Sequence, residues 1–186
     1  MRVITAIEEY KKSEDDICVF LAGGITNCWE WQDAVIEELK KRCKEGYNDL
    51  VIINPRRKNF PINDPNASKE QIEWEFEMLE KADIFSMYFT EGVSDQPICM
   101  YELGRNIVRM QMRFPLDLDD RIAITCENGY KRKNDVLIQT RLAAGFEPLM
   151  ITVCSKREET HMAHASKIRV LYHCLKRTLS VYPDWD

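Results

Sequence analysis

Long hydrophobic runs and paired cysteines are missing from this sequence. No apolar stretch approaches the length of a membrane span, and residues 1–12 lack the apolar core of a secretory signal. The seven cysteines are scattered singly, without a C-x-x-C motif, and most stand in apolar contexts. This usage is typical of reduced core thiols in a cytosolic protein. We therefore expect a cytoplasmic protein with no membrane partner.

An excess of positive charge is also missing. Lys+Arg 26 against Asp+Glu 31 gives a formal net charge of −5, so we expect no nucleic-acid polymer as a partner. The sequence lacks Gly-x-Ser-x-Gly, and no motif indicates a Cys/His pair. His161 and His164 are three residues apart but stand in no convergent carboxylate pattern. We expect neither a metal nor another cofactor.

The sequence does have the size and composition of one globular domain, with 186 residues, 45% hydrophobic and 31% charged. We expect this domain to span residues 1–186. Runs suitable for buried strands are Ile17–Ala22, Leu50–Asn54, Ile84–Phe89, Arg121–Cys126 and Pro148–Val153. Helical patterns occur at residues 29–44, 69–81, 97–113, 134–144 and 158–180. The alternation predicts an α/β fold, a doubly wound five-stranded parallel sheet in the order 2-1-3-4-5 with helices on both faces.

Ligands of such sheets bind outside the carboxyl ends of the strands, near the switch point between the first and third strands. The turn Gly23-Gly24-Ile25 after the first strand should therefore face residues 90–102 after the third. Pro97 suits the first position of a helix, and Glu102 follows soon after it. We expect the helix dipole to stabilise Glu102 as an anion, and Gly104 to let the helix lie close to the sheet.

A second carboxylate is predicted on the helix over residues 69–81. Ser68 is expected to cap this helix, with Gln71 at the capping-box position. Ile72, Phe76 and Leu79 would form its buried stripe, with Glu75 on the edge that faces the sheet. Glu75 is then either a satisfied polar contact or a second active-site carboxylate.

Several polar and aromatic residues near the strand ends are candidate substrate contacts. Arg56-Arg57-Lys58 and Lys131-Arg132-Lys133 are either solvated loop charges or phosphate-binding groups. Asn54 ends the second strand and could contact a base or sugar. Trp29, at the start of the first helix, is a candidate for stacking on a base, whereas Trp31 is expected in the core.

Four segments together resemble the nucleoside 2-deoxyribosyltransferase family, including its deoxyribosyltransferase-like branch. They are Phe20-Leu21-Ala22-Gly23-Gly24, Trp74-Glu75 with Asp83, Tyr101-Glu102-Leu103-Gly104, and Cys126–Asn134, which contains Asn128. The resemblance implies a flavodoxin-like sheet, usually oligomeric, that cleaves the N-glycosidic bond of 2′-deoxynucleosides. It makes Glu102 the nucleophile that attacks C1′, Glu75 an acid beside the sugar or the nucleophile, and Asn128 a candidate substrate contact.

The sequence also departs from the family pattern at two positions. Gln96 stands where transferases commonly carry Asp, with Asp95 adjacent as an alternative acid, and Phe20 stands where a tyrosine often hydrogen-bonds the nucleophile. Three functions therefore remain open. The first is transfer of deoxyribose between bases, the second is hydrolysis of deoxynucleoside 5′-monophosphates, and the third is non-catalytic nucleotide binding.

Overall fold

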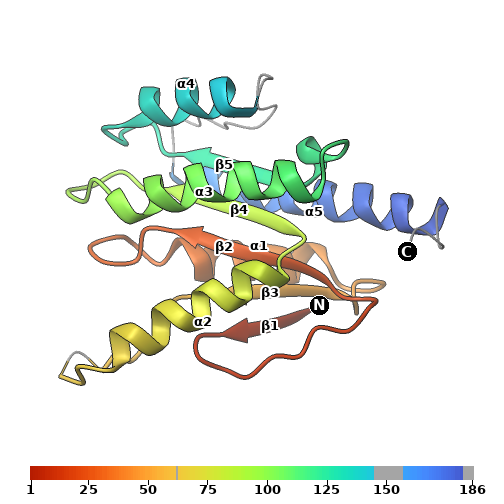
Figure 1. The fold of residues 1–186 in the computed structure, drawn as a ribbon, viewed down its shortest axis with the longest axis horizontal. Coiled ribbons are helices and arrows are strands. Elements are labelled where there is room, and N and C mark those ends of the chain that lie inside the picture. The colour runs from red at the N-terminus through yellow and green to blue at the C-terminus, as the bar shows by residue number, and fades with distance from the viewer. Residues whose placement is uncertain (62, 145–156, 182–186) are drawn as a thin grey trace.

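The described part of the chain forms a parallel five-stranded sheet between two layers of helices (Figure 1). The computed structural model describes residues 1–61, 63–144 and 157–181. The strands are β1 (Arg2–Thr5), β2 (Ile17–Gly23), β3 (Leu50–Asn54), β4 (Ile84–Phe89) and β5 (Ile122–Cys126). The helices are α1 (Trp31–Arg42), α2 (Ala67–Lys81), α3 (Pro97–Arg113), α4 (Lys133–Ala144), α5 (Arg157–Val181) and a short 3-10 helix, Leu118–Asp120. The class is therefore the predicted flavodoxin-like α/β fold.

The strand order is β1-β3-β2-β4-β5. The first four predicted strands are confirmed in their relative order, but the sequence analysis missed β1, which pairs with β3 from Arg2–Val51 to Thr5–Asn54. The predicted order 2-1-3-4-5 is thus wrong at one edge of the sheet, because β1 lies outside β3, which is the second predicted strand. The predicted strand over residues 148–153 lies outside the described residues.

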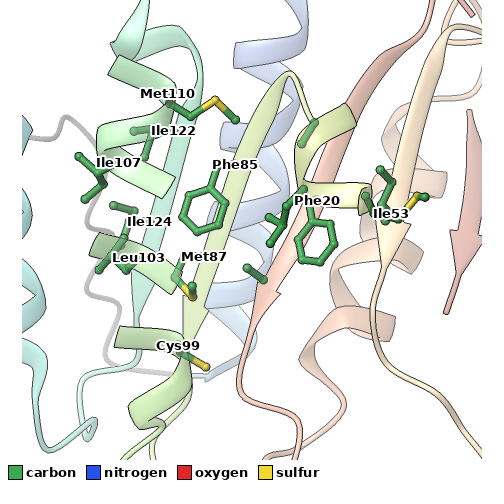
Figure 2. Packing of buried hydrophobic residues seen from close by; sticks show 14 of the residues in the cluster. Phe20, Ile53, Phe85, Met87, Cys99, Leu103, Ile107, Met110, Ile122 and Ile124 are labelled. Atoms are coloured by element: carbon green, nitrogen blue, oxygen red, sulfur yellow. The ribbon is translucent and has the colours of Figure 1, made fainter. Parts of the chain in front are cut away.

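Each face of the sheet has its own hydrophobic core. β2 alternates between them: Phe20 and Ala22 face the layer of α2, α3 and α4, whereas Val19 and Leu21 face α1 and α5. Figure 2 shows the first core, where Phe85 and Met87 of β4 lie on the side of Leu103 and Cys99 of α3, and Phe20 of β2 lies beside Ile53 of β3. This packing holds the first turns of α3 against the carboxyl ends of β2 and β4.

The buried face of α2 differs from the prediction. Trp74, Met78 and Leu79 are buried, whereas Ile72 and Phe76 are exposed. The expected stripe was wrong for these two residues because two overlapping sets of apolar side chains fit helical spacing, and the set with Trp74 and Met78 packs on the sheet. The helix begins at Ala67, after an N-cap at Asn66 that makes no side-chain hydrogen bond, so Ser68 is inside the helix and caps nothing.

The last helix, α5, covers the other face of the sheet. Ile168, Leu171 and Leu175 are buried in the core formed with α1. His164 is fully buried, between the Ser86 and Thr125 hydroxyls at 2.7 and 2.8 Å, and burial lowers its pKa to about 3. Within the described ranges, no helix has the length and apolar character needed to cross a membrane.

Candidate active site

A pocket of about 250 Å³ lies at the carboxyl end of β2, between α2 and α3. Its lining comes from the turn after β2, the segment before α3, and the facing sides of the two helices. The lining residues are Phe20, Ala22, Gly23, Gly24, Ile25, Thr26, Pro55, Glu75, Ser94, Gln96, Pro97, Ile98, Cys99 and Glu102. The two loops that were expected to face each other therefore do so. The volume is somewhat below the roughly 300–1,000 Å³ usual for small-molecule sites, so it suits a compact ligand.

The two glycines of the turn are required by its geometry. Gly23 has φ 148°, and a Cβ there would lie 2.3 Å from the Tyr88 carbonyl oxygen. A Cβ on Gly24 would lie 2.4 Å from Cys28 Sγ and 2.6 Å from Gln96 Oε1. At Gly23 only glycine fits, because the contact is with backbone and φ is positive, whereas a Cβ at Gly24 would have to displace the side chains of Cys28 and Gln96. The two glycines therefore contribute backbone to the lining of the pocket.

Glu102 extends from α3 into the pocket and is partly buried. Because α3 starts at Pro97, Glu102 is the sixth residue of the helix and lies beyond the first turn, where the dipole effect is concentrated. The expected dipole stabilisation was therefore wrong. Burial, followed by the charge of Glu75, raises the pKa of Glu102 to about 7, and Arg105 opposes the rise.

Gly104 does not bring α3 close to the sheet. It is exposed, and a Cβ at this position would meet nothing within 4 Å. The expectation of close packing was wrong because Gly104 lies on the solvent side of the helix, whereas Leu103 and Ile107 are buried.

Glu75 enters the same pocket from α2 and is fixed by a neighbour. Nε2 of Gln71 donates to Glu75 Oε1 at 2.7 Å and to the Pro55 carbonyl oxygen at 2.7 Å. Burial raises the pKa of Glu75, and the hydrogen bond from Gln71 opposes this rise. Glu75 is therefore a hydrogen-bonded side chain that also faces a cavity, and its role as a second active-site carboxylate stays a prediction.

Cys99 is the other ionisable group from α3 in the lining. Burial raises the pKa of its thiol to about 12. A thiol in this state is a poor nucleophile, because the thiolate is the reactive form. The remaining ionisable groups of the lining are the carboxyls of Glu75 and Glu102.

Gln96 lines the pocket, but its side chain is hydrogen-bonded within the loop that precedes α3. Its Nε2 donates to the Thr90 carbonyl oxygen at 2.7 Å, and its backbone is left-handed at φ 49°. Asp95, the alternative acid, is exposed, lies outside the lining, and has Lys131 Nζ 3.8 Å from its carboxylate. The structure brings Gln96, but not Asp95, to the two glutamates.

Trp29 lies away from the pocket, on the α5 side of the sheet. Its Nε1 donates to Glu127 Oε1 at 2.7 Å, and the Arg157 guanidinium stands 5.3 Å from its ring centroid. Glu127 is buried at the end of β5 and also accepts hydrogen bonds from the Tyr88 hydroxyl and the Glu91 N–H. Trp29 therefore belongs to a separate polar cluster. Trp31 is buried in the core, as predicted.

Asn54 and Arg56 line a different cavity, next to β1 and α1. Arg56 donates to Gln32 Oε1 at 2.8 Å and to the Trp29 carbonyl oxygen at 3.0 Å, so it braces the loop before α1. Asn54 Oδ1 accepts from the Arg56 N–H at 3.0 Å. Neither side chain lines the pocket of the glutamates.

The basic loop after β5 also lies outside this pocket. Asn128 is exposed and accepts a hydrogen bond from Lys133 at 2.8 Å. Lys131 faces Asp95, and Arg132 pairs with Asp135 at 2.8 Å. In the other basic cluster, Arg57 pairs with Glu70 of α2 at 3.5 Å, so residues of both clusters have partners outside the pocket.

The described parts of the chain hold no group of three or more His, Cys, Asp or Glu side chains arranged for a metal ion. The sequence analysis missed the contribution of Gln71, which it assigned to a helix cap. The four-residue spacing between Gln71 and Glu75 was the available signal, because such residues are neighbours on a helix.

The arrangement defines an α/β protein of the flavodoxin-like class, with a pair of carboxylates over a glycine turn at the switch point of the sheet. Such a pair can stabilise a developing cation and can form a covalent bond to carbon. Residues 16–114, more than half of the chain, match the family described as nucleoside 2-deoxyribosyltransferase like. The chain belongs to this family, which implies a glycosyltransferase-like protein with small-molecule nucleoside substrates. Comparison with curated proteins gave no match.

Proposed function

We propose that this protein cleaves the N-glycosidic bond of 2′-deoxynucleosides and transfers the deoxyribose to another base. The observation that carries the proposal is the pair of Glu75 and Glu102 in one pocket above the turn at Gly23 and Gly24. The family match supports the same class of substrate.

Glu102 is the nucleophile in this proposal. As the C1′–N bond breaks, its electron pair stays on the base, and a Glu102 oxygen forms a bond to C1′ from the opposite face. The departing base takes a proton from water, because Asp95 lies outside the pocket and Gln96 is tied to Thr90. In the second half, a nitrogen of the acceptor base attacks C1′, Glu102 leaves as a carboxylate, and the acceptor loses its N–H proton to water.

Glu75 contacts the sugar and stabilises the oxocarbenium character that develops at C1′. A carboxylate near the reacting carbon is most effective where water is scarce. The burial of the pair, expressed in the raised pKa of both carboxyls, supports this role. Phe20 lines the same pocket and offers no hydroxyl, so Glu102 remains unanchored by this strand.

The charges around the pocket favour a nucleoside over a nucleotide. The residues that line it include no lysine, arginine or histidine. Arg56 and the loop at Lys131 lie outside the lining and have partners of their own. Hydrolysis of 5′-monophosphates and non-catalytic binding are the alternatives that the test must separate.

The test is incubation with each 2′-deoxynucleoside and each 5′-monophosphate, with and without an acceptor base, followed by chromatography. New nucleoside that forms only with the acceptor supports the proposal. Free base from monophosphates alone would make the protein a hydrolase. Binding by calorimetry without turnover of any substrate would make it a binding module.

We further propose that the protein is a cytoplasmic homo-oligomer. Exposed apolar side chains gather on the outer sides of α2 and α3, which are neighbours in Figure 1. They are Ile72, Phe76, Ile98, Tyr101, Val108 and Met112. Exposed apolar side chains that gather on one side of a protein are typical of protein–protein contacts, and a second copy of the chain is the proposed partner.

A further inference from the structure

We propose that Gln71 is a positioning residue that holds Glu75 as the charged member of the pair, and so places the proton that the pair shares on Glu102. This inference deepens the proposed function, on which its kinetic consequence rests. Gln71 does not line the pocket and acts through Glu75.

The orientation of the Gln71 amide is fixed by its two partners. One is the Pro55 carbonyl oxygen just after β3, and the other is Glu75 Oε1 one helical turn further along α2. Both are acceptors, so the NH₂ group must face them. Rotating the amide would turn its oxygen toward two other oxygens. The amide is therefore a fixed donor to Glu75.

This orientation leaves the oxygen of the same amide without a hydrogen-bond donor. Gln71 is 9% exposed, and its Oε1 is buried without a hydrogen-bond partner in the described structure. An unsatisfied buried acceptor costs about 1–3 kcal/mol. Both N–H groups of the amide nevertheless remain hydrogen-bonded to Pro55 and Glu75. Gln71 therefore donates a hydrogen bond to Glu75 and accepts none from it, which favours the ionised form of Glu75.

Glu102 has no comparable donor. Its carboxylate makes no hydrogen bond or ion pair with any residue that the structure describes. Arg105 acts on it only at longer range, and the Arg105 guanidinium lies 3.4 Å from Glu80. When two buried carboxyls share one proton, it stays on the carboxyl with the poorer hydrogen bonding, which here is Glu102.

The other groups that face the pair do not change this order. Cys99 of α3 is a neutral thiol, and Cys28 in the loop after β2 is near enough to act on Cys99. From β2 and the segment after β3, the lining residues are Phe20, Ala22, Gly23 and Pro55, none of which is charged. Arg105 lowers the pKa of Glu102 and so opposes this order, which leaves the donor from Gln71 as the group that favours the charge on Glu75.

The kinetic consequence is that Gln71 sets the pH below which Glu102 is protonated and cannot attack. Without the donor, the proton moves to Glu75, and Glu102 becomes ionised at lower pH. In Gln71→Met, the acid limb of kcat/KM therefore moves to lower pH. The maximal kcat falls roughly ten- to a hundred-fold because Glu75 is no longer held in place, while KM changes little.

The direct test needs no substrate. In protein labelled with ¹³C at the glutamate carboxyls, NMR titration separates Glu75 and Glu102, which are assigned with Glu75→Gln and Glu102→Gln. We expect the signal of Glu102 to titrate above that of Glu75 in the unsubstituted protein, and the order to reverse in Gln71→Met. The matched control is Gln32→Met, which removes a buried glutamine from α1 on the other face of the sheet and should leave both titrations unchanged.

Two results would overturn the inference. One is a titration of Glu75 above Glu102 in the unsubstituted protein, which is readable even if Gln71→Met does not fold. The other is a folded Gln71→Met whose two titrations match those of the unsubstituted protein. The absence of turnover would instead count against the proposed function and leave the carboxyl titrations to decide the role of Gln71.

Discussion

Glu75 of α2 and Glu102 of α3 face one pocket, where burial and then the charge of Glu75 raise the pKa of Glu102 to about 7. The two residues are 27 positions apart in sequence and come from helices that cover the same face of the sheet (Figure 1). Two carboxyls held together in this way cannot both ionise easily. The pH dependence of the charge on these two carboxyls is therefore the property of the site that is easiest to measure.

We expect the activity to fall as pH drops below about 7. Glu102 must be ionised to attack C1′, and its raised pKa places the loss of its charge near neutral pH rather than near 4.5. The measurement is kcat/KM for a deoxynucleoside between pH 4 and 9. A profile that stays flat down to pH 5 would contradict an essential role for the anion of Glu102.

Glu102→Gln should stabilise the protein at alkaline pH. A carboxyl whose pKa is higher in the folded state binds its proton more tightly there, so the free energy of unfolding decreases as pH rises from about 4.5 to about 7. Above that range the charged Glu102 destabilises the fold. We expect the substitution to add about 1–3 kcal/mol at pH 8.5 and much less at pH 4.5.

Urea unfolding of both proteins at the two pH values measures this difference. Stabilisation together with lost turnover is the pattern expected of an active-site carboxylate, because such groups are kept at a cost in stability. Equal destabilisation at both pH values would indicate a structural role for Glu102 instead.

Two glycine substitutions should have opposite effects. Gly24→Ala would place a Cβ 2.4 Å from Cys28 Sγ and 2.6 Å from Gln96 Oε1, so the side chains of Cys28 and of Gln96, which lines the pocket, must shift. We expect a rise in KM of at least about ten-fold, because a displacement of about 1 Å can change activity by more than that.

Gly104→Ala is the matched control for the glycine turn. The added Cβ meets nothing within 4 Å, and alanine is favoured over glycine inside a helix by about 0.8–1.0 kcal/mol. We expect a higher melting temperature and unchanged kinetics. A loss of activity in Gly104→Ala would show that its position on the solvent side of α3 has a function that the packing does not reveal.

A charge on the outer face of α2 should separate the subunits. Phe76 is 52% exposed, and Phe76→Asp would put a carboxylate into the proposed contact between copies. We expect a lower sedimentation coefficient than for the unsubstituted protein. Leu116→Asp, at a residue that is 95% exposed just after α3, should leave the coefficient unchanged. A monomeric unsubstituted protein at micromolar concentration would contradict the proposed oligomer.

The sequence predicted the central strands well because each is a short apolar run between turn residues. It missed β1, where Val3 and Ile4 are the main apolar residues of a four-residue strand in a charged segment. An edge strand of this length carries little periodic signal. Its place is set by pairing with β3, which is almost fifty residues further along the chain.

The site was predicted only in part, because some of its residues follow from the strand pattern and others depend on distant contacts. Gly24 and Glu102 follow buried strands, and the rule for strand ends places them together. The position of Trp29 depends on Glu127, 98 residues away, so no local pattern could predict it. Arg56 is likewise held by Gln32, a contact between a loop and the buried side of α1.

The central claim is that Glu102 bonds covalently to deoxyribose. The most direct measurement is the intact mass of the protein after rapid acid quenching of a reaction with a 2′-deoxynucleoside and no acceptor. We expect a species heavier by one anhydrodeoxyribose, with the added mass on the peptide that contains Glu102, and its absence in Glu102→Ala. Turnover of the same substrate by folded Glu102→Ala at the unsubstituted rate would contradict the account.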